Sequence, residues 1–141
     1  DILLVDEVDM FFSPKFYGQT YYPATDLHSA EVTKMLKTVW QHRQLPHSDL
    51  VQTMRASTEF QQLNKAMPNL DWFTDRELRR MCAAASNFSP SGYHCDCAGN
   101  RIGLKEFDCV RYNHQEYKFC FAALYEADHN RFHDVDAALA N

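Results

Sequence analysis

Three acidic side chains near the start of the chain have the type and spacing needed for metal-assisted hydrolysis of a nucleotide. Asp6, Glu7 and Asp9 follow the aliphatic run Ile2–Val5. A strand buried in an α/β sheet directs its C-terminal end toward the ligand crevice, and four aliphatic residues in a row are typical of such a strand. Asp6 is then placed to hold Mg²⁺ through coordinated water. Glu7 is placed to orient or deprotonate the attacking water, a role worth about 10²–10⁴-fold in rate.

The same acids are also compatible with a solvated loop that follows a strand, because this pattern is common. The phosphate-binding loop G-x-x-x-x-G-K-[ST] occurs nowhere in the 141 residues.

The chain also opens inside an apolar run, so we expect its ends to be cut from a longer protein. We expect the complete protein to be an ATPase and this stretch by itself to be inactive, because the phosphate loop would lie elsewhere.

The residues that follow this motif predict a connector, then a helix, then a stretch whose structure is ambiguous. Residues 11–22 carry six aromatic side chains interrupted by Pro14 and Gly18, which predicts an irregular connector. An apolar stripe at helical spacing then predicts a helix from Leu27 to Arg43, capped by Asp26 or Ser29. Its members are Val32, Met35, Leu36, Val39 and Trp40. The stretch 45–57 is ambiguous, and we expect a strand or loop around Leu50–Met54.

Two further helices and a hairpin are predicted downstream. A short helix is expected over Ser57–Met67, and another should begin at Thr74, where Thr74 and Glu77 match a capping box. Alternation on both sides of 98–100 predicts a β-hairpin. A last helix should end near His129, after a second capping box formed by Asn113 and Glu116.

Composition narrows the function classes. The net charge is −5, from 14 basic and 19 acidic residues, and no basic patch is evident, which argues against nucleic acid as the partner. No apolar run approaches the ~20 residues of a membrane-spanning helix. The odd count of five cysteines indicates reduced thiols and therefore an intracellular protein. We expect a cytoplasmic location, which is compatible with attachment to the surface of a membrane. Cys95 and Cys97 could suggest zinc, but a one-residue spacing is unusual for a zinc site and favours buried thiols.

The opening motif also supports a family resemblance. Ile2–Asp9 resembles the Walker B, or DEAD-type, segment of SecA preprotein translocase ATPases. Several later segments resemble the eukaryotic SecA-like branch in the same order. These are Phe16–Tyr21, Thr33–Arg43, Arg101–Glu106 and Tyr117–Glu126. The resemblance covers most of the chain, but only the opening motif is specific for chemistry.

This resemblance implies ATP and Mg²⁺ as cofactors of the complete protein. It implies that Asp6 is the Mg²⁺-associated acid, that Glu7 is the catalytic base, and that Asp9 links the nucleotide state to neighbouring motifs. Residues 1–26 would end the nucleotide-binding motor domain. Residues 27–141 would form an insertion resembling the preprotein-crosslinking region, whose C-terminal end is compatible with a return to the motor domain. This insertion does not match the bacterial one residue by residue.

The implied fold class is an α+β fragment, in which one strand of a P-loop-type α/β motor sheet precedes a mixed helix and β-hairpin insertion. The implied activity couples ATP hydrolysis to polypeptide translocation, with an unfolded polypeptide or preprotein and a membrane channel as partners. Two alternatives remain open. A DExD-type nucleic-acid helicase shares the acidic motif, and a non-enzymatic interaction module would carry the same acids as surface residues.

Overall fold

The computed structural model describes residues 29–140, except 107–108 and 113–115. Six helices and three strands lie in these ranges, and together they form an α+β fold. The helices are α3 (Ala30–Gln41), α4 (His47–Arg55), α5 (Thr58–Ala66), α6 (Asp71–Ser86), α7 (Tyr117–Asp128) and α8 (Val135–Ala140). The strands are β1 (His94–Asp96), β2 (Arg101–Glu106) and β3 (Cys109–Arg111).

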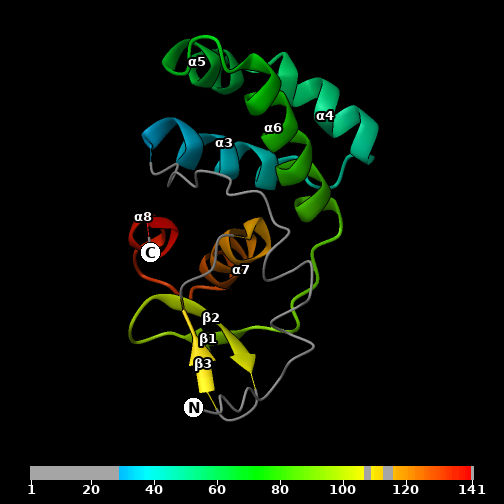
Figure 1. Ribbon diagram of the computed structural model, residues 1–141. Coiled ribbons are helices and arrows are strands. Elements are labelled where there is room, and N and C mark those ends of the chain that lie inside the picture. The colour runs from blue at the N-terminus through cyan, green and yellow to red at the C-terminus, as the bar shows by residue number, and fades with distance from the viewer. Residues whose placement is uncertain (1–28, 107–108, 113–115, 141) are drawn as a thin grey trace, which may run out of the picture.

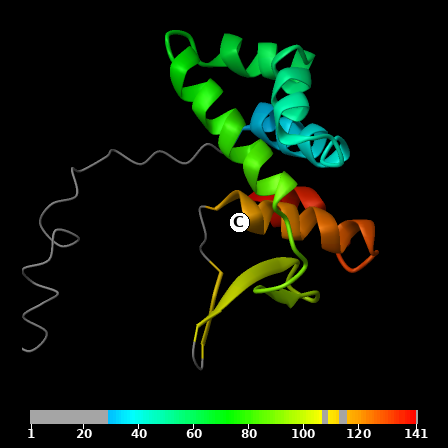
Figure 2. The ribbon, with the colours of Figure 1, turned by 90° about the vertical axis from the view of Figure 1, so that its right-hand side faces the viewer.

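Helix α7 lies at the centre of this arrangement. It packs against α3 and α6 on one side and against β2 on the other, and α8 lies beside it. Figures 1 and 2 show α3, α4, α5 and α6 gathered at one end of the molecule, with the sheet at the opposite end. Helix α7 therefore joins the helical layer to the sheet, and its side chains pack against both.

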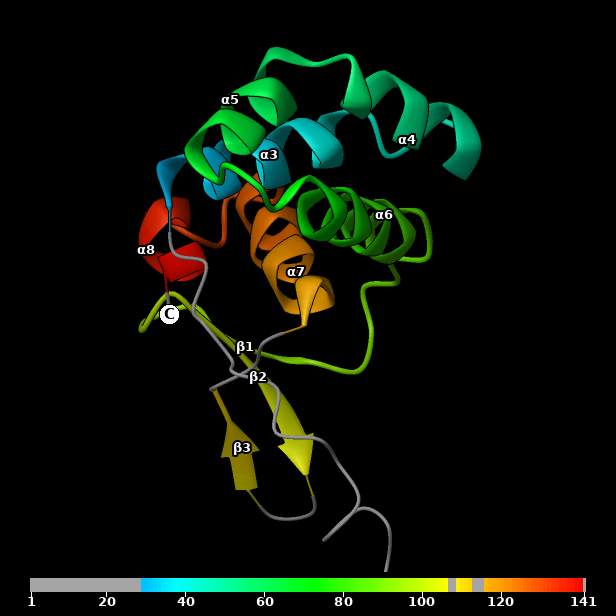
Figure 3. The ribbon, with the colours of Figure 1, turned by 45° about the horizontal axis from the view of Figure 1, so that its top comes forward.

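The sheet is small and antiparallel. β2 is the central strand, with His94 of β1 opposite Gly103 and Arg111 of β3 opposite Leu104. A Cβ added at Gly103 would overlap the Val110 side chain, so glycine allows this close approach. Figure 3 shows the β2–β3 end of the sheet extending away from the helices. The β1–β2 hairpin agrees with the alternation in the sequence, whereas β3 was not predicted.

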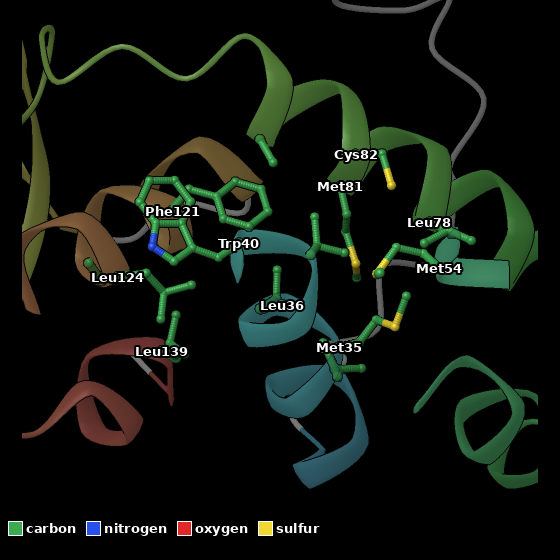
Figure 4. Close-up of a cluster of buried hydrophobic side chains, with 14 of the residues drawn as sticks. Met35, Leu36, Trp40, Met54, Leu78, Met81, Cys82, Phe121, Leu124 and Leu139 are labelled. Atoms are coloured by element: carbon green, nitrogen blue, oxygen red, sulfur yellow. The ribbon is translucent and has the colours of Figure 1, made fainter. Parts of the chain in front are cut away.

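The hydrophobic core continues from α3 to α8 as one cluster. Between α3, α4 and α6 it contains Met35, Met54, Leu78 and Met81, all at most 1 % exposed, and we call these four residues the methionine core (Figure 4). Toward α7 the Trp40 ring stacks on Phe121 with centroids 5.7 Å apart. Trp40 Nε1 also donates to Asp128 Oδ2 at 2.8 Å, which fixes α3 against the end of α7.

The first predicted helix is confirmed in its described part. α3 begins after Ser29, whose hydroxyl accepts the Val32 N–H at 3.2 Å, so Ser29 is the cap. The whole predicted apolar stripe is buried. The predicted helix over Ser57–Met67 corresponds to α5, and Ser57 caps it by accepting the Phe60 N–H.

The expectation of a strand or loop around Leu50–Met54 was wrong, because these residues lie in α4. Leu50, Val51 and Met54 fall on one helical face and are buried. A short apolar run of this kind does not distinguish a strand from a helix by spacing alone. Pro46 stands immediately before the helix, where its missing N–H costs no intrahelical hydrogen bond.

Both predicted capping boxes were also wrong. α6 begins at Asp71, which places Thr74 inside the helix, and its hydroxyl donates to the Asn64 side chain. Glu77 is buried and does not cap the helix. Glu116 itself occupies the N-cap position of α7, and Asn113 lies outside the described residues. The C-terminal end of α7 near His129 is confirmed, whereas α8 was not predicted.

Two expectations concern parts of the chain that the structure does not describe. The strand of a P-loop-type sheet predicted for Ile2–Val5 lies outside the described residues, as does the connector at 11–22. The three described strands are all antiparallel. None of the helices in the described ranges combines the length and the apolar character needed to cross a membrane.

Candidate functional site

The acidic residues predicted to carry the chemistry are not among those that the structure describes. Asp6, Glu7 and Asp9 all lie before residue 29. The Mg²⁺ site and the ATP site therefore stay predictions from the sequence. The described residues instead show an open groove between α6 and α7. Two of the tyrosines that line it are hydrogen-bonded to buried glutamates behind it.

The α6–α7 groove has a volume of about 520 Å³. It is bounded by the second half of α6, the segment that follows it, and the first turn of α7. Its apolar lining consists mainly of Ala83, Ala84, Phe88, Tyr93, Tyr117 and Phe119. The two alanines on α6 make this space, since larger side chains there would occupy it. A hollow of this size and lining fits a hydrophobic side chain or a small apolar ligand.

The first pair behind the groove joins α6 to α7. Tyr117 directs its hydroxyl to Glu77 Oε2 at 2.9 Å. Arg80 Nη1 donates to the same oxygen at 3.0 Å, and Arg76 Nε donates to Oε1 at 3.1 Å. Glu77 is only 6 % exposed, and a buried carboxylate needs charged or hydrogen-bonding partners. The two arginines supply them, while the outer parts of their side chains remain in water.

The second pair joins the segment before β1 to the C-terminal half of α7. The Tyr93 hydroxyl donates to Glu126 Oε1 at 2.7 Å. Glu126 Oε2 lies 3.0 Å from Arg131 Nη1, an ion pair. Within the described residues this oxygen makes no hydrogen bond of good geometry, and Glu126 is 2 % exposed. Its charge is thus stabilised mainly by one hydroxyl and one arginine.

Both tyrosines keep their phenolic protons over a wide pH range. Burial, followed by the charge of Glu77, raises the pKa of Tyr117 well above its ordinary value. Burial and the hydrogen bond to Glu126 raise the pKa of Tyr93 in the same way. Because both hydroxyls donate inward to carboxylates, the tyrosines present their rings to the groove.

The polar rim of the groove is mixed in charge. Arg80 lies at the rim, with its guanidinium carbon 5.9 Å from the centre of the Tyr117 ring. Lys118 Nζ forms an exposed ion pair with Glu116 Oε2 at 2.8 Å. Exposed pairs of this type contribute little energy and rearrange easily. The cationic groups at the rim could meet an acidic group on a ligand whose apolar part occupies the groove.

Cys95 and Cys97 differ from the buried thiol pair that the sequence predicted. Cys95 is half-buried, whereas Cys97 is exposed in the turn after β1, so the prediction was wrong for Cys97. Their Sγ atoms lie 3.4 Å apart. Among the residues that the structure describes, no group of three or more His, Cys, Asp or Glu side chains could hold a metal ion. This pair therefore lacks a third protein ligand in the described part.

Sequence reasoning missed the two buried glutamates, although the spacing contains a signal for both. Glu77 follows Thr74 by three residues and precedes Leu78 and Met81, all of which are buried. Glu126 likewise follows Phe119, Ala122 and Ala123 by seven, four and three residues, which places it on the buried face of α7. An acid at such a position predicts a buried, partnered carboxylate.

Comparisons with known proteins do not identify a family. No family model matches the chain, and neither a curated protein nor a solved structure matches it.

Proposed function

We propose that this chain is part of a SecA-like ATP-driven motor that couples ATP hydrolysis to the movement of polypeptide. The observation that carries the proposal is the run Ile2–Val5 followed by Asp6 and Glu7. Asp6 would hold Mg²⁺, Glu7 would activate the attacking water, and Asp9 would relay the nucleotide state. The proposal implies action inside the cell, with a membrane channel as a further partner.

The described residues add support of a different kind. An open, mainly apolar groove suits the side chains of an extended polypeptide, because it offers burial without demanding one particular shape. The rim is mixed in charge, with Arg80 and Lys118 each paired to a carboxylate. The lack of a cluster of lysines and arginines at this groove favours polypeptide over nucleic acid, since phosphate backbones are bound by such clusters. The groove equally supports a non-enzymatic interaction module, which is the second candidate.

The test is the substitution Glu7→Gln in a longer form of the protein that includes a phosphate-binding loop. Mg-ATP binding should persist, because the substitution keeps the size of the side chain and leaves Asp6 in place. Turnover should fall by about 10²–10⁴-fold, because the base is lost. Glu31→Gln is the matched control, since Glu31 is an acid in the first turn of α3, and its turnover should equal that of the wild type.

Two outcomes would separate the rival functions. Turnover stimulated by an unfolded polypeptide supports the motor, whereas turnover stimulated only by nucleic acid supports the helicase. If Glu7→Gln leaves turnover unchanged, Glu7 is not the base. If the longer protein binds no Mg-ATP at all, the acids are surface residues and the interaction module is the better description.

A further inference from the structure

Outside the groove, two thiols on the β1–β2 hairpin are close enough to react with one another. Cys95 Sγ and Cys97 Sγ lie 3.4 Å apart, in contact but not bonded, since a disulfide has an S–S length of about 2.05 Å. Cys97 is exposed, while Cys95 packs against the core. The other described cysteines are Cys82 and Cys120 on helices and Cys109 on β3, which is also exposed.

The surroundings assign different roles to the two thiols. Burial, followed by the hydrogen bond with Cys97, raises the pKa of Cys95 to about 12, so Cys95 keeps its proton at neutral pH. The two sulfurs share one hydrogen bond, in which either sulfur can donate. Cys97 is exposed, so a disulfide in solution can reach it before it can reach the half-buried Cys95, and Cys97 is the sulfur that attacks first.

The backbone between the thiols is held independently of them. Asp96 Oδ1 accepts the Gly99 N–H at 3.0 Å, and Asp96 Oδ2 forms an ion pair with Arg101 Nη2 at 2.8 Å. The turn therefore keeps both sulfurs on the same side, where a loosely held loop would let them separate.

We propose that Cys95 and Cys97 form a dithiol site that reacts with small-molecule disulfides of the glutathione type. The Cys97 thiolate attacks one sulfur of glutathione disulfide, forming a mixed disulfide and releasing one glutathione thiolate. Cys95 then loses its proton to solvent, and its thiolate attacks Cys97 Sγ. The bond to glutathione breaks, and the second departing thiolate takes up a proton from water. The protein loses two hydrogen atoms, and one glutathione disulfide is reduced to two glutathione molecules.

The test incubates the 141-residue chain with glutathione disulfide and follows each cysteine by mass spectrometry of peptides. The wild type should accumulate the Cys95–Cys97 disulfide and little mixed disulfide at Cys97. Cys95→Ser removes the resolving sulfur, so the mixed disulfide at Cys97 should rise by about tenfold or more, because an adjacent thiol outcompetes one in solution. Cys97→Ser should leave Cys95 largely unmodified.

A matched control makes the result decisive. Cys109→Ser removes the other exposed thiol and should leave formation of the Cys95–Cys97 disulfide unchanged. A persistent mixed disulfide at Cys97 in the wild type would overturn the proposal, as would a disulfide that involves Cys109.

Discussion

Helix α6 borders two regions whose interiors are built from different chemistry. On one face it contributes Leu78 and Met81 to the methionine core, where α3 and α4 supply only apolar partners. On the other it contributes Glu77 to the layer behind the α6–α7 groove, which we call the groove wall, where the buried carboxylate is hydrogen-bonded by Tyr117 and by two partly exposed arginines. The methionine core depends on volume alone, whereas the groove wall depends on matching each buried polar atom with a partner.

This difference explains why the two regions should respond differently to substitution. Loss of volume in a packed core removes contacts and leaves a cavity, and the cost grows with the size of that cavity. In the groove wall, by contrast, removing one hydroxyl changes almost no volume. It leaves Glu77 Oε2 with Arg80 as its remaining donor, and the cost is the loss of one hydrogen bond to a charged group. The substitutions below separate these two origins of stability.

The largest effect is expected in the methionine core. Leu78 is 1 % exposed, so Leu78→Ala should lower the free energy of unfolding by about 2–5 kcal/mol. Urea unfolding followed by circular dichroism measures this change. Leu45→Ala is the matched control, because Leu45 is 37 % exposed and the same truncation there should change stability by no more than about 0.5 kcal/mol. Equal losses in both variants would show that Leu78 is not a core residue.

A smaller effect is expected at the groove wall. Tyr117→Phe keeps the ring but removes the hydroxyl that donates to Glu77, and it should lower the free energy of unfolding by about 1–3 kcal/mol at neutral pH. Tyr125→Phe is the control, since the Tyr125 ring packs against Phe88 and His129 and should tolerate the change. A loss at Tyr125 as large as that at Tyr117 would contradict the proposed role of the buried pair.

The pH dependence of Tyr117→Phe provides a second measurement of the same pair. Because the pKa of Tyr117 is raised in the folded chain, the folded state holds the phenolic proton more tightly than the unfolded state. The resulting stability is fully present below the ordinary tyrosine pKa of about 10 and is lost as the pH rises further. Above that pH the wild type should therefore lose stability more steeply than Tyr117→Phe.

The same contrast shows which parts of the fold were predictable from the sequence. The apolar stripe of α3 reports burial directly, and the alternation on both sides of the turn at 98–100 reports paired strands. The structure confirms the helix, its buried stripe and the β1–β2 hairpin. The groove wall was not predicted, because Glu77 was assigned to a helix cap and its partner Tyr117 lies 40 residues away. Pairing between distant polar residues leaves no periodic trace. β3 and α8 are only three and six residues long, too short for a periodic signal.

The smallest effect is expected at the start of α3, where the helix that carries Met35 into the methionine core begins. Ser29→Ala removes the oxygen that accepts the Val32 N–H, and it should lower the free energy of unfolding by about 1 kcal/mol. Ser29→Asp supplies another acceptor and should restore most of that loss, which distinguishes a cap from a packing contact. If Ser29→Asp is as unstable as Ser29→Ala, the hydroxyl does not act as a cap. In that case the stability of α3 comes from its buried stripe alone.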